Sequence, residues 1–152
     1  MTRHHYSAHI EWQGTTGAGY GGYSRTHTAT APPAAQQLSL SADPAFRGDA
    51  DLLDPEQLLV TAASSCQLLS FLAVAAQAGL DVLSYEDAAT AVLDTGSAPP
   101  QIAEIRLAPM IRVAPGTDHE KVRTAAATAH RGCYIANTLK CPVQVEVTVI
   151  DA

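Results

Sequence analysis

The spacing of hydrophobic and polar residues changes several times along the chain, and these changes separate predicted strands from predicted helices. A two-residue period, typical of half-buried strands, occurs in three early segments: 7–12, 23–30 and 37–42. In the third of them Leu38 and Leu40 fall on one face, and serines fall on the other. The glycine-rich stretch 14–22 carries no phosphate-binding spacing, so we interpret it as the turn of a hairpin.

A helical period begins after Asp54. This residue is a good N-cap, Pro55 suits the first helical position, and Gln57 three residues after the cap completes a capping box. The apolar pattern continues to Ala78, and Gly79 supplies the end. The sequence therefore predicts a helix of about 24 residues, which is about 36 Å long.

This long helix is apolar on nearly every face, which one small domain would not cover by itself. We therefore expect a homodimer in which a second subunit buries part of the helix. Polar residues interrupt its apolar pattern: Thr61, Ser64, Ser65, Gln67, Ser70 and Gln77. Because a membrane span needs about 20 predominantly apolar residues, we expect a buried helix and no membrane partner.

The second half of the chain returns to strands and then to helices. We expect strands over 85–93, 102–113 and 143–149, a helix capped by Thr117 and Glu120, and a short helix over 133–140. The predicted order is β-β-β-α-β-β-α-β, an α+β class, in a single domain over 1–152.

Composition narrows the class of function. The chain has 152 residues, 47% of them hydrophobic, which argues against disorder. Its net charge of −6 without basic runs makes nucleic acid an unexpected partner. The N-terminus lacks the apolar stretch of a signal peptide, so we expect a cytoplasmic protein. In that reducing compartment a disulfide among the three cysteines is expected to be transient.

Two of the cysteines lie where chemistry is plausible. Cys133 follows a glycine and opens the short helix, where backbone N–H groups favour a thiolate, and His130 and Arg131 precede it. Cys66 lies in the middle of the long helix and needs a separate cation to become a thiolate. The alternative is that both are buried small apolar residues.

Arg47 and Glu56 supply a candidate cation and its partner. They are close enough in sequence to pair, and a paired arginine presents its other donors to a thiolate. The alternative is a surface ion pair worth about 0–1 kcal/mol. Glu56 and Cys66 are about 15 Å apart along one helix, so a shared site takes Arg47 and Glu56 from one subunit and the cysteines from the other.

A metal site is a further alternative. His130 and Cys133 have an i, i+3 spacing, and Cys66 or Cys141 would be the third ligand. Cys141 precedes Pro142 at a strand start, where it is a packing residue or a competing resolving thiol.

Three segments resemble the OsmC/Ohr family, the osmotically inducible and organic hydroperoxide resistance proteins. Residues 54–59 followed by Cys66 resemble its "NPEELL…C" helix. Residues 129–133 followed by 135–137 resemble its second cysteine segment, and 41–49 looks like one branch of the family. The resemblance, closest to the OsmC-like peroxiredoxin branch, covers nearly the whole chain.

The resemblance implies an intertwined α+β homodimer, with long central helices packed against antiparallel sheets. It implies a thiol peroxidase for organic hydroperoxides that uses no metal or flavin and is reduced by a dithiol, such as a dihydrolipoyl protein. By matching position Cys66 is the peroxidatic cysteine, Cys133 the resolving one, Arg47 the activating arginine, and Glu56 the residue that orients it. Disulfide formation needs the two Cα atoms within about 7 Å.

Some residues depart from the family pattern. Gln67 stands where an aromatic residue or histidine is usual, and Tyr134 where many members have proline. The spacing from Arg47 to the long helix is shorter than in some members, so Arg25 is the alternative activating arginine. We expect Leu69 and Phe71 to contribute to an apolar lining of the site around Cys66, which suits an organic peroxide. The alternative function is a non-enzymatic protein that binds an apolar ligand or senses redox state at the dimer interface.

Overall fold

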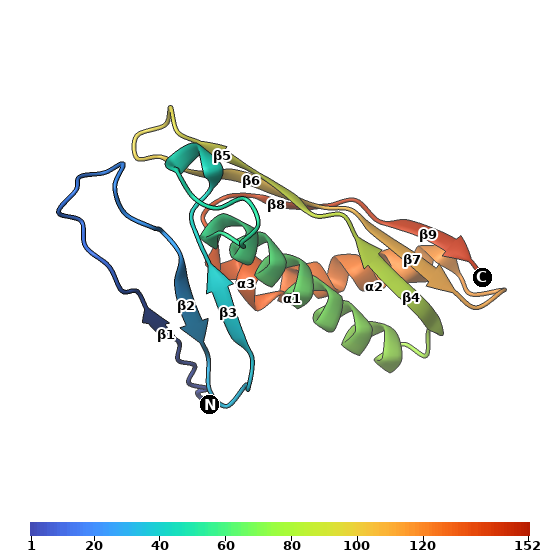
Figure 1. Cartoon of the computed structure of the whole chain (residues 1–152). Coiled ribbons are helices and arrows are strands. Elements are labelled where there is room, and N and C mark those ends of the chain that lie inside the picture. The colour runs from blue at the N-terminus through green and yellow to red at the C-terminus, as the bar shows by residue number, and fades with distance from the viewer. The chain divides into compact units, whose positions relative to one another are not determined.

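The computed structural model describes all 152 residues. They form two compact units, Met1–Leu58 and Leu59–Ala152 (Figure 1). Three α-helices and nine strands confirm the predicted α+β class. The single domain expected over 1–152 stays a prediction.

The first unit contains a three-stranded antiparallel sheet in the order β1-β2-β3. Its strands lie within the three segments of period two: β1 His9–Glu11, β2 His27–Thr30 and β3 Gln37–Leu40. A short 3₁₀ helix, η1 Pro44–Phe46, follows them. After η1 the chain passes so close to the carbonyl oxygen of Ala42 that a side chain at Gly48 would collide with it. Glycine is therefore required at this turn.

Helix α1, Pro55–Gln77, begins and ends as predicted. Asp54 Oδ1 accepts a hydrogen bond from the Gln57 amide at 2.7 Å, and Gln57 Oε1 accepts one from the Asp54 amide at 3.1 Å. At the other end Gly79 has a φ of +67°, and the Leu80 amide donates back to the Ala75 carbonyl. These contacts are a capping box and a glycine-terminated C-cap.

Each of the three long strands expected in the second half is divided in two. The structure forms β4 Val82–Asp87, β5 Thr90–Asp94, β6 Gln101–Leu107, β7 Pro109–Val113, β8 Val143–Val145 and β9 Thr148–Asp151. At the break between β6 and β7 the Ala108 amide donates to Asp87 Oδ1 at 2.7 Å, and Pro109 has no N–H to donate. The chain therefore leaves the hydrogen-bonded ladder at this point.

The breaks produce two three-stranded sheets with the orders β4-β7-β9 and β5-β6-β8. Within each sheet one pairing is antiparallel and the other is parallel: β6 runs parallel to β8, and β7 runs parallel to β9. The expected antiparallel arrangement is therefore confirmed for β1-β2-β3, whereas the two sheets of the second unit are mixed. The alternating valines of 143–149 belong to two strands that pair in different sheets.

Helix α2 spans His119–Gly132 and α3 spans Tyr134–Thr138. The expected cap of α2 was one residue early. Asp118 is the N-cap and accepts hydrogen bonds from two amides of the first turn, whereas the Thr117 hydroxyl donates to a carbonyl of the preceding turn. A carboxylate placed at the cap also complements the positive end of the helix dipole.

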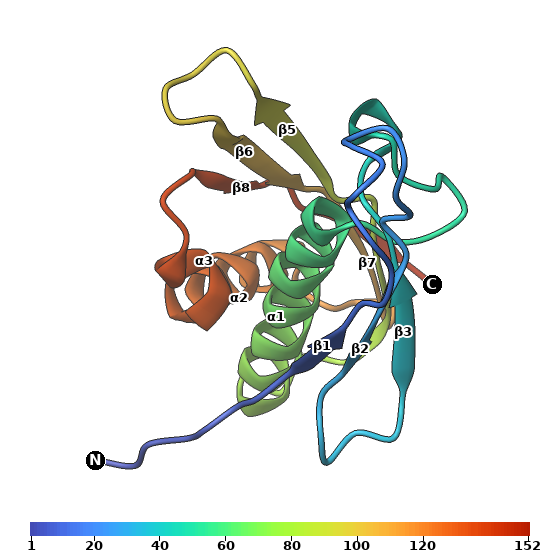
Figure 2. The same ribbon diagram turned by 60° about the vertical axis from the view of Figure 1, so that its left-hand side comes forward.

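Helices α1 and α2 lie on the same face of the sheets in the second unit (Figure 2). One core joins them to β7 and β9: Phe71, Ala75, Ile111, Val113, Val122, Ala125, Ala126, Ala129 and Val149. A second core centres on Ala63, Ile105 and Leu107. By length and composition alone α1 would be able to cross a membrane, but it supplies buried residues to both cores.

Candidate functional site: the cysteine pair

The structure brings Cys66 and Cys133 together. Cys66 is half-buried on α1, and Cys133 is only 1% exposed at the junction where α2 ends and α3 begins. The two thiols are hydrogen-bonded to each other, and neither is in a disulfide. Residues 67 positions apart in the sequence are therefore in contact because α1 packs beside the α2–α3 junction.

The surroundings of Cys66 favour its thiolate. Burial raises the pKa of the Cys66 thiol, but hydrogen bonds from the Cys133 thiol, the backbone N–H groups of Ile135 and Tyr134, and the Ser70 hydroxyl outweigh it. The net pKa of Cys66 is lowered from the ordinary value. The sequence predicts only a separate cation as the source of this stabilisation, whereas the first amides of α3 donate to Cys66.

Cys133 has the opposite tendency. Burial, the hydrogen bond to Cys66 and the charge of Cys66 raise the pKa of Cys133, and backbone hydrogen bonds from Ala136 and Ile135 only partly oppose them. The short helix therefore favours a thiolate at Cys66 more than at the cysteine that precedes it. A pair divided in this way has one thiol suited to nucleophilic attack and one that stays protonated as a hydrogen-bond donor.

Three of these donors were not identified from the sequence. Ser70 lies one helical turn after Cys66, a spacing at which side chains on a helix meet, so the pattern could have revealed it. The amides of Tyr134 and Ile135 reach Cys66 only through the packing of α3 against α1. No sequence motif indicates that contact.

Gln67 holds α1 against α2 immediately after Cys66. It is fully buried, and its Nε2 donates to the Ala126 carbonyl at 3.1 Å. Its Oε1 is buried without a partner. An unpaired buried acceptor is unfavourable by about 1–3 kcal/mol, which offsets what the donated hydrogen bond contributes.

We predict that Gln67→Met changes the free energy of unfolding by less than about 1 kcal/mol, because methionine preserves the volume and removes the unpaired acceptor. Gln67→Ala leaves a cavity and is expected to cost about 2–4 kcal/mol. Urea denaturation of both variants measures the difference. Equal losses in the two variants would show that the hydrogen bond to Ala126 outweighs packing.

The guanidinium groups of the two candidate arginines, Arg25 and Arg47, both lie near the ring of Tyr20 in the first unit. The Arg25 guanidinium lies 4.7 Å from the ring centroid of Tyr20 and 4.0 Å from that of Tyr23, and it donates to both of their backbone carbonyls. Arg47 is exposed, has a φ of +65°, and lies 5.8 Å from the Tyr20 centroid. Arg25 is thus the more firmly held of the two.

Arg47 and Glu56 are not paired within the chain. The ion pairs join Glu104 with Arg106, His119 with Asp151, and Glu120 with Arg123. Glu56 is half-buried in the first turn of α1. The roles assigned to Arg47 and Glu56 by resemblance therefore stay predictions.

The remaining candidates are placed as follows. Cys141 packs in the second core beside Ile135 and lies next to a cavity that His130 also lines. No three side chains of His, Cys, Asp or Glu form a group that could hold a metal ion, so the metal–thiolate alternative lacks its ligands in this chain. The expected lining by Phe71 was wrong, because Phe71 is fully buried, whereas Leu69 is 64% exposed.

Comparison with known proteins agrees with this architecture. The structure of an OsmC-like protein of unknown function from Vibrio cholerae is 26% identical, with a TM-score of 0.86, and the match covers 96% of this chain and 100% of that one. An organic hydroperoxide resistance protein from Elizabethkingia anophelis is 18% identical, with a TM-score of 0.73 and 99% of both chains covered. Another from Legionella pneumophila is 17% identical, with a TM-score of 0.69 and 98% of both covered.

No functionally curated protein matches the sequence significantly. A family profile described as OsmC-like protein matches residues 48–148, about two thirds of the chain, including both cysteines of the pair. The protein therefore belongs to the OsmC-like family.

Proposed function

We propose that this protein is a thiol-dependent peroxidase that reduces organic hydroperoxides to alcohols. The observation that carries the proposal is the hydrogen-bonded pair of thiols, in which the pKa of Cys66 is lowered and that of Cys133 is raised. Family relatives of known structure include organic hydroperoxide resistance proteins, which agrees with a peroxide substrate.

In the first step the Cys66 thiolate attacks one oxygen of the hydroperoxide and the O–O bond breaks. Cys66 is oxidised to the sulfenic acid, and the departing alkoxide takes up from water a proton equivalent to the one that the Cys66 thiol released on ionisation, which gives the alcohol. The amides of Tyr134 and Ile135 stabilise the attacking thiolate. An arginine near the site would favour both the thiolate and the departing alkoxide.

In the second step the Cys133 sulfur attacks the Cys66 sulfenic sulfur. The S–O bond breaks, an S–S bond forms, and the thiol proton leaves with the hydroxyl group as water. An external dithiol, such as a dihydrolipoyl group on a protein, then reduces the disulfide and is itself oxidised. The raised pKa of Cys133 keeps its proton available for the departing hydroxyl.

The proposal is tested with purified protein, an alkyl hydroperoxide and dihydrolipoamide as the dithiol. We expect the hydroperoxide to be consumed together with the dithiol, and faster than hydrogen peroxide at the same concentration. No consumption above that of dithiol alone would overturn the proposal.

Such a negative result would favour a ligand-binding role. One observation supports that role as a second candidate: the first unit contains a largely apolar cavity of about 440 Å³ lined by Ile10, Trp12, Tyr23 and Arg25, among others. A cavity of this size suits a small apolar ligand.

We predict that Arg25, the more firmly held of the two arginines, is the one that activates Cys66. Arg25→Gln is expected to lower kcat/KM for an alkyl hydroperoxide by about 10- to 100-fold, because loss of a preorganised cation removes stabilisation of the transition state. Arg47→Gln, which removes the same charge from the same neighbourhood, is the matched control. A larger loss in Arg47→Gln would restore the assignment made by resemblance.

We also propose that the protein is a homodimer. Leu69 and Leu72 on α1 are 64% and 40% exposed, a pattern expected where a second subunit covers a helix. Sedimentation velocity at micromolar concentration is expected to give a dimer, and Leu69→Glu combined with Leu72→Glu a monomer. Leu83→Glu, at a leucine on β4 that is 52% exposed, is the control that should leave the dimer intact. A wild-type monomer contradicts the proposal.

A further inference from the structure

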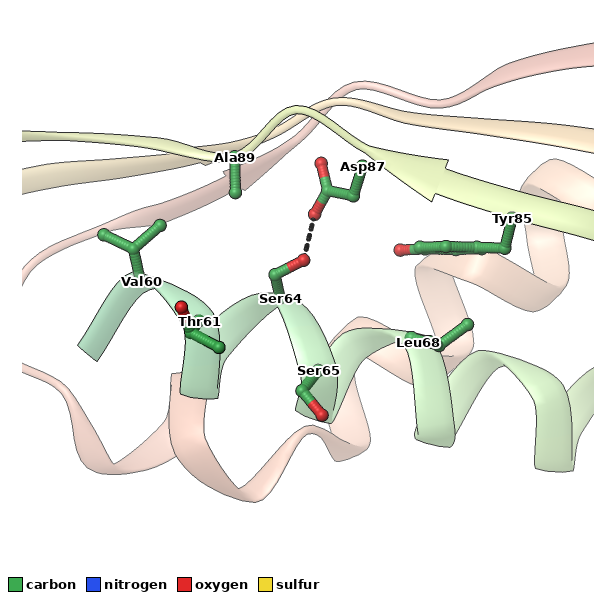
Figure 3. A pocket seen from close by; sticks show the side chains of 8 residues that line it. All are labelled: Val60, Thr61, Ser64, Ser65, Leu68, Tyr85, Asp87 and Ala89. Atoms are coloured by element: carbon green, nitrogen blue, oxygen red, sulfur yellow. Dashed lines mark hydrogen bonds between the residues drawn. The ribbon is translucent and has the colours of Figure 1, made fainter. Parts of the chain in front are cut away.

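A cavity of about 390 Å³ with a mixed polar and apolar lining lies between α1 and β4 in the second unit (Figure 3). From α1 it is lined by Val60, Thr61, Ser64, Ser65 and Leu68, and from the strand side by Tyr85, Asp87 and Ala89. The Ser64 hydroxyl and the Asp87 carboxylate meet across the cavity, and the phenol oxygen of Tyr85 is directed toward them (Figure 3). Val60 and Ala89 make one end apolar.

The cavity has a negative charge and no positive one. Asp87 Oδ2 accepts from the Ser64 hydroxyl at 2.5 Å, and Oδ1 accepts from the Ala108 amide at 2.7 Å. A carboxylate has about four lone-pair sites, so two remain for a ligand. No lysine, arginine or histidine lines the cavity, and Asp87 is in none of the ion pairs of the chain. The electrostatics therefore favour a cation.

The hydroxyl of Tyr85 is a second polar group in the cavity, and it makes no hydrogen bond. This hydroxyl is buried, and the ring packs 5.8 Å from that of Phe71 in the core. Buried hydroxyls without partners are rare in folded proteins, because each loses its hydrogen bonds to water. Burial and the charge of Asp87 also raise the pKa of Tyr85, so the phenol is neutral and does not add to the negative charge.

We propose that this cavity is a binding site for a primary alkylammonium ion. The ammonium group has three donors, which match three acceptors that converge in the cavity: Asp87 Oδ2, Ser64 Oγ and the Tyr85 hydroxyl oxygen. The alkyl chain lies against Val60 and Ala89. A divalent metal fits less well, since Mg²⁺ and Ca²⁺ take about six or more oxygen ligands and the cavity offers a single carboxylate.

The site is distinct from the cysteine pair. Successive residues of a helix are rotated by about 100°, so Cys66 points about 200° away from Ser64 around α1. Cys66 faces the start of α3, whereas Ser64 faces Asp87 on β4. The cavity therefore lies on the opposite side of α1 from Cys66, although the charge of Cys133 also contributes to the raised pKa of Tyr85.

Titration of the full-length protein with n-butylammonium, followed by ¹H–¹⁵N NMR, tests the proposal. We expect a saturable shift of the Ala108 amide with a Kd of roughly 1 mM, and only a small, non-saturating shift with n-butanol at the same concentrations. Asp87→Asn should weaken n-butylammonium binding about tenfold or more. Asp81→Asn, which removes an equal but exposed charge just before β4, should not weaken it.

The variant Tyr85→Phe distinguishes a loss of ligand affinity from a loss of protein stability. It removes the unpaired hydroxyl, so the melting temperature should be unchanged or higher while the affinity falls several-fold. This variant keeps the test valid if Asp87→Asn is unstable. The proposal is overturned if no saturable shift occurs up to about 50 mM, if n-butanol binds equally well, or if Ca²⁺ produces the same shift at lower concentration. The proposal is also overturned if n-butylammonium binds only at protein concentrations low enough to dissociate a dimer. That result would mean that a basic side chain of a second copy fills the cavity in the dimer.

Discussion

Cys66→Ser is expected to abolish turnover of an alkyl hydroperoxide, with kcat/KM lowered by on the order of 10³-fold or more. Serine has the same shape but no accessible anion near neutral pH, so the hydrogen bonds from Cys133, Tyr134 and Ile135 have no thiolate to stabilise. The measurement is steady-state hydroperoxide consumption with dihydrolipoamide. Retention of more than about a tenth of the activity would rule out Cys66 as the nucleophile.

Cys133→Ser should behave differently, and the difference identifies the two roles. Without a resolving thiol the first turnover still occurs, so we expect a burst of one alcohol per subunit, followed by overoxidation of Cys66 to the sulfinic acid. Mass spectrometry of the Cys66 peptide detects the two added oxygens. Cys141→Ser, which removes a thiol outside the pair, is the control that should keep full turnover. If Cys141→Ser overoxidises and Cys133→Ser does not, Cys141 is the resolving residue.

Tyr134→Pro is expected to raise the pKa of Cys66 and to slow its alkylation near pH 7 about tenfold. Proline removes one of the two backbone N–H donors to this thiol, and a hydrogen bond to a charged group contributes about 1.5–3 kcal/mol. Tyr134 is the first residue of α3, where proline is compatible with a helix, so the fold should survive. Iodoacetamide labelling across pH, read at the Cys66 peptide, gives the pH midpoint.

The direction of the change in the pH midpoint follows from the fact that the thiolate is the form of Cys66 that is alkylated. The wild-type pKa of Cys66 is below the ordinary value, so its labelling rate should level off at a lower pH than that of a free cysteine. Loss of an N–H donor moves the midpoint upward, toward the ordinary value. Tyr134→Ala keeps the amide and removes only a side chain that is 83% exposed, so its profile should match wild type. Equal shifts in the alanine and proline variants would mean that the tyrosine side chain matters, not the amide.

The ends of α1 could be predicted because their determinants are local. Asp54 and Gln57 are three residues apart and exchange hydrogen bonds across one turn, and Gly79 adopts a left-handed conformation open to few other residues. The cap of α2 was missed by one residue because Thr117 and Asp118 are both good caps. Only the preceding turn, which uses the Thr117 hydroxyl, decides between them.

The division of the long strands could not be predicted from periodicity. A two-residue period records which face of a strand is buried, and it continues through 143–149 without interruption. The break between β8 and β9 arises because their partners, β6 and β7, belong to different sheets. Sheet pairing is a property of residues distant in sequence.

The sequence alone determined the fold class, the long apolar helix with its caps, and the two cysteines that carry the proposed chemistry, because hydrophobic period and capping act between neighbours in the chain. Only the tertiary structure decided which thiol is favoured as the anion. Packing brings the start of α3 against Cys66, and its amides lower the pKa of a mid-helix cysteine that has no such donors on its own helix. Packing likewise places Asp87 and Tyr85 around one cavity with Ser64, a contact between residues that lie more than 20 positions apart.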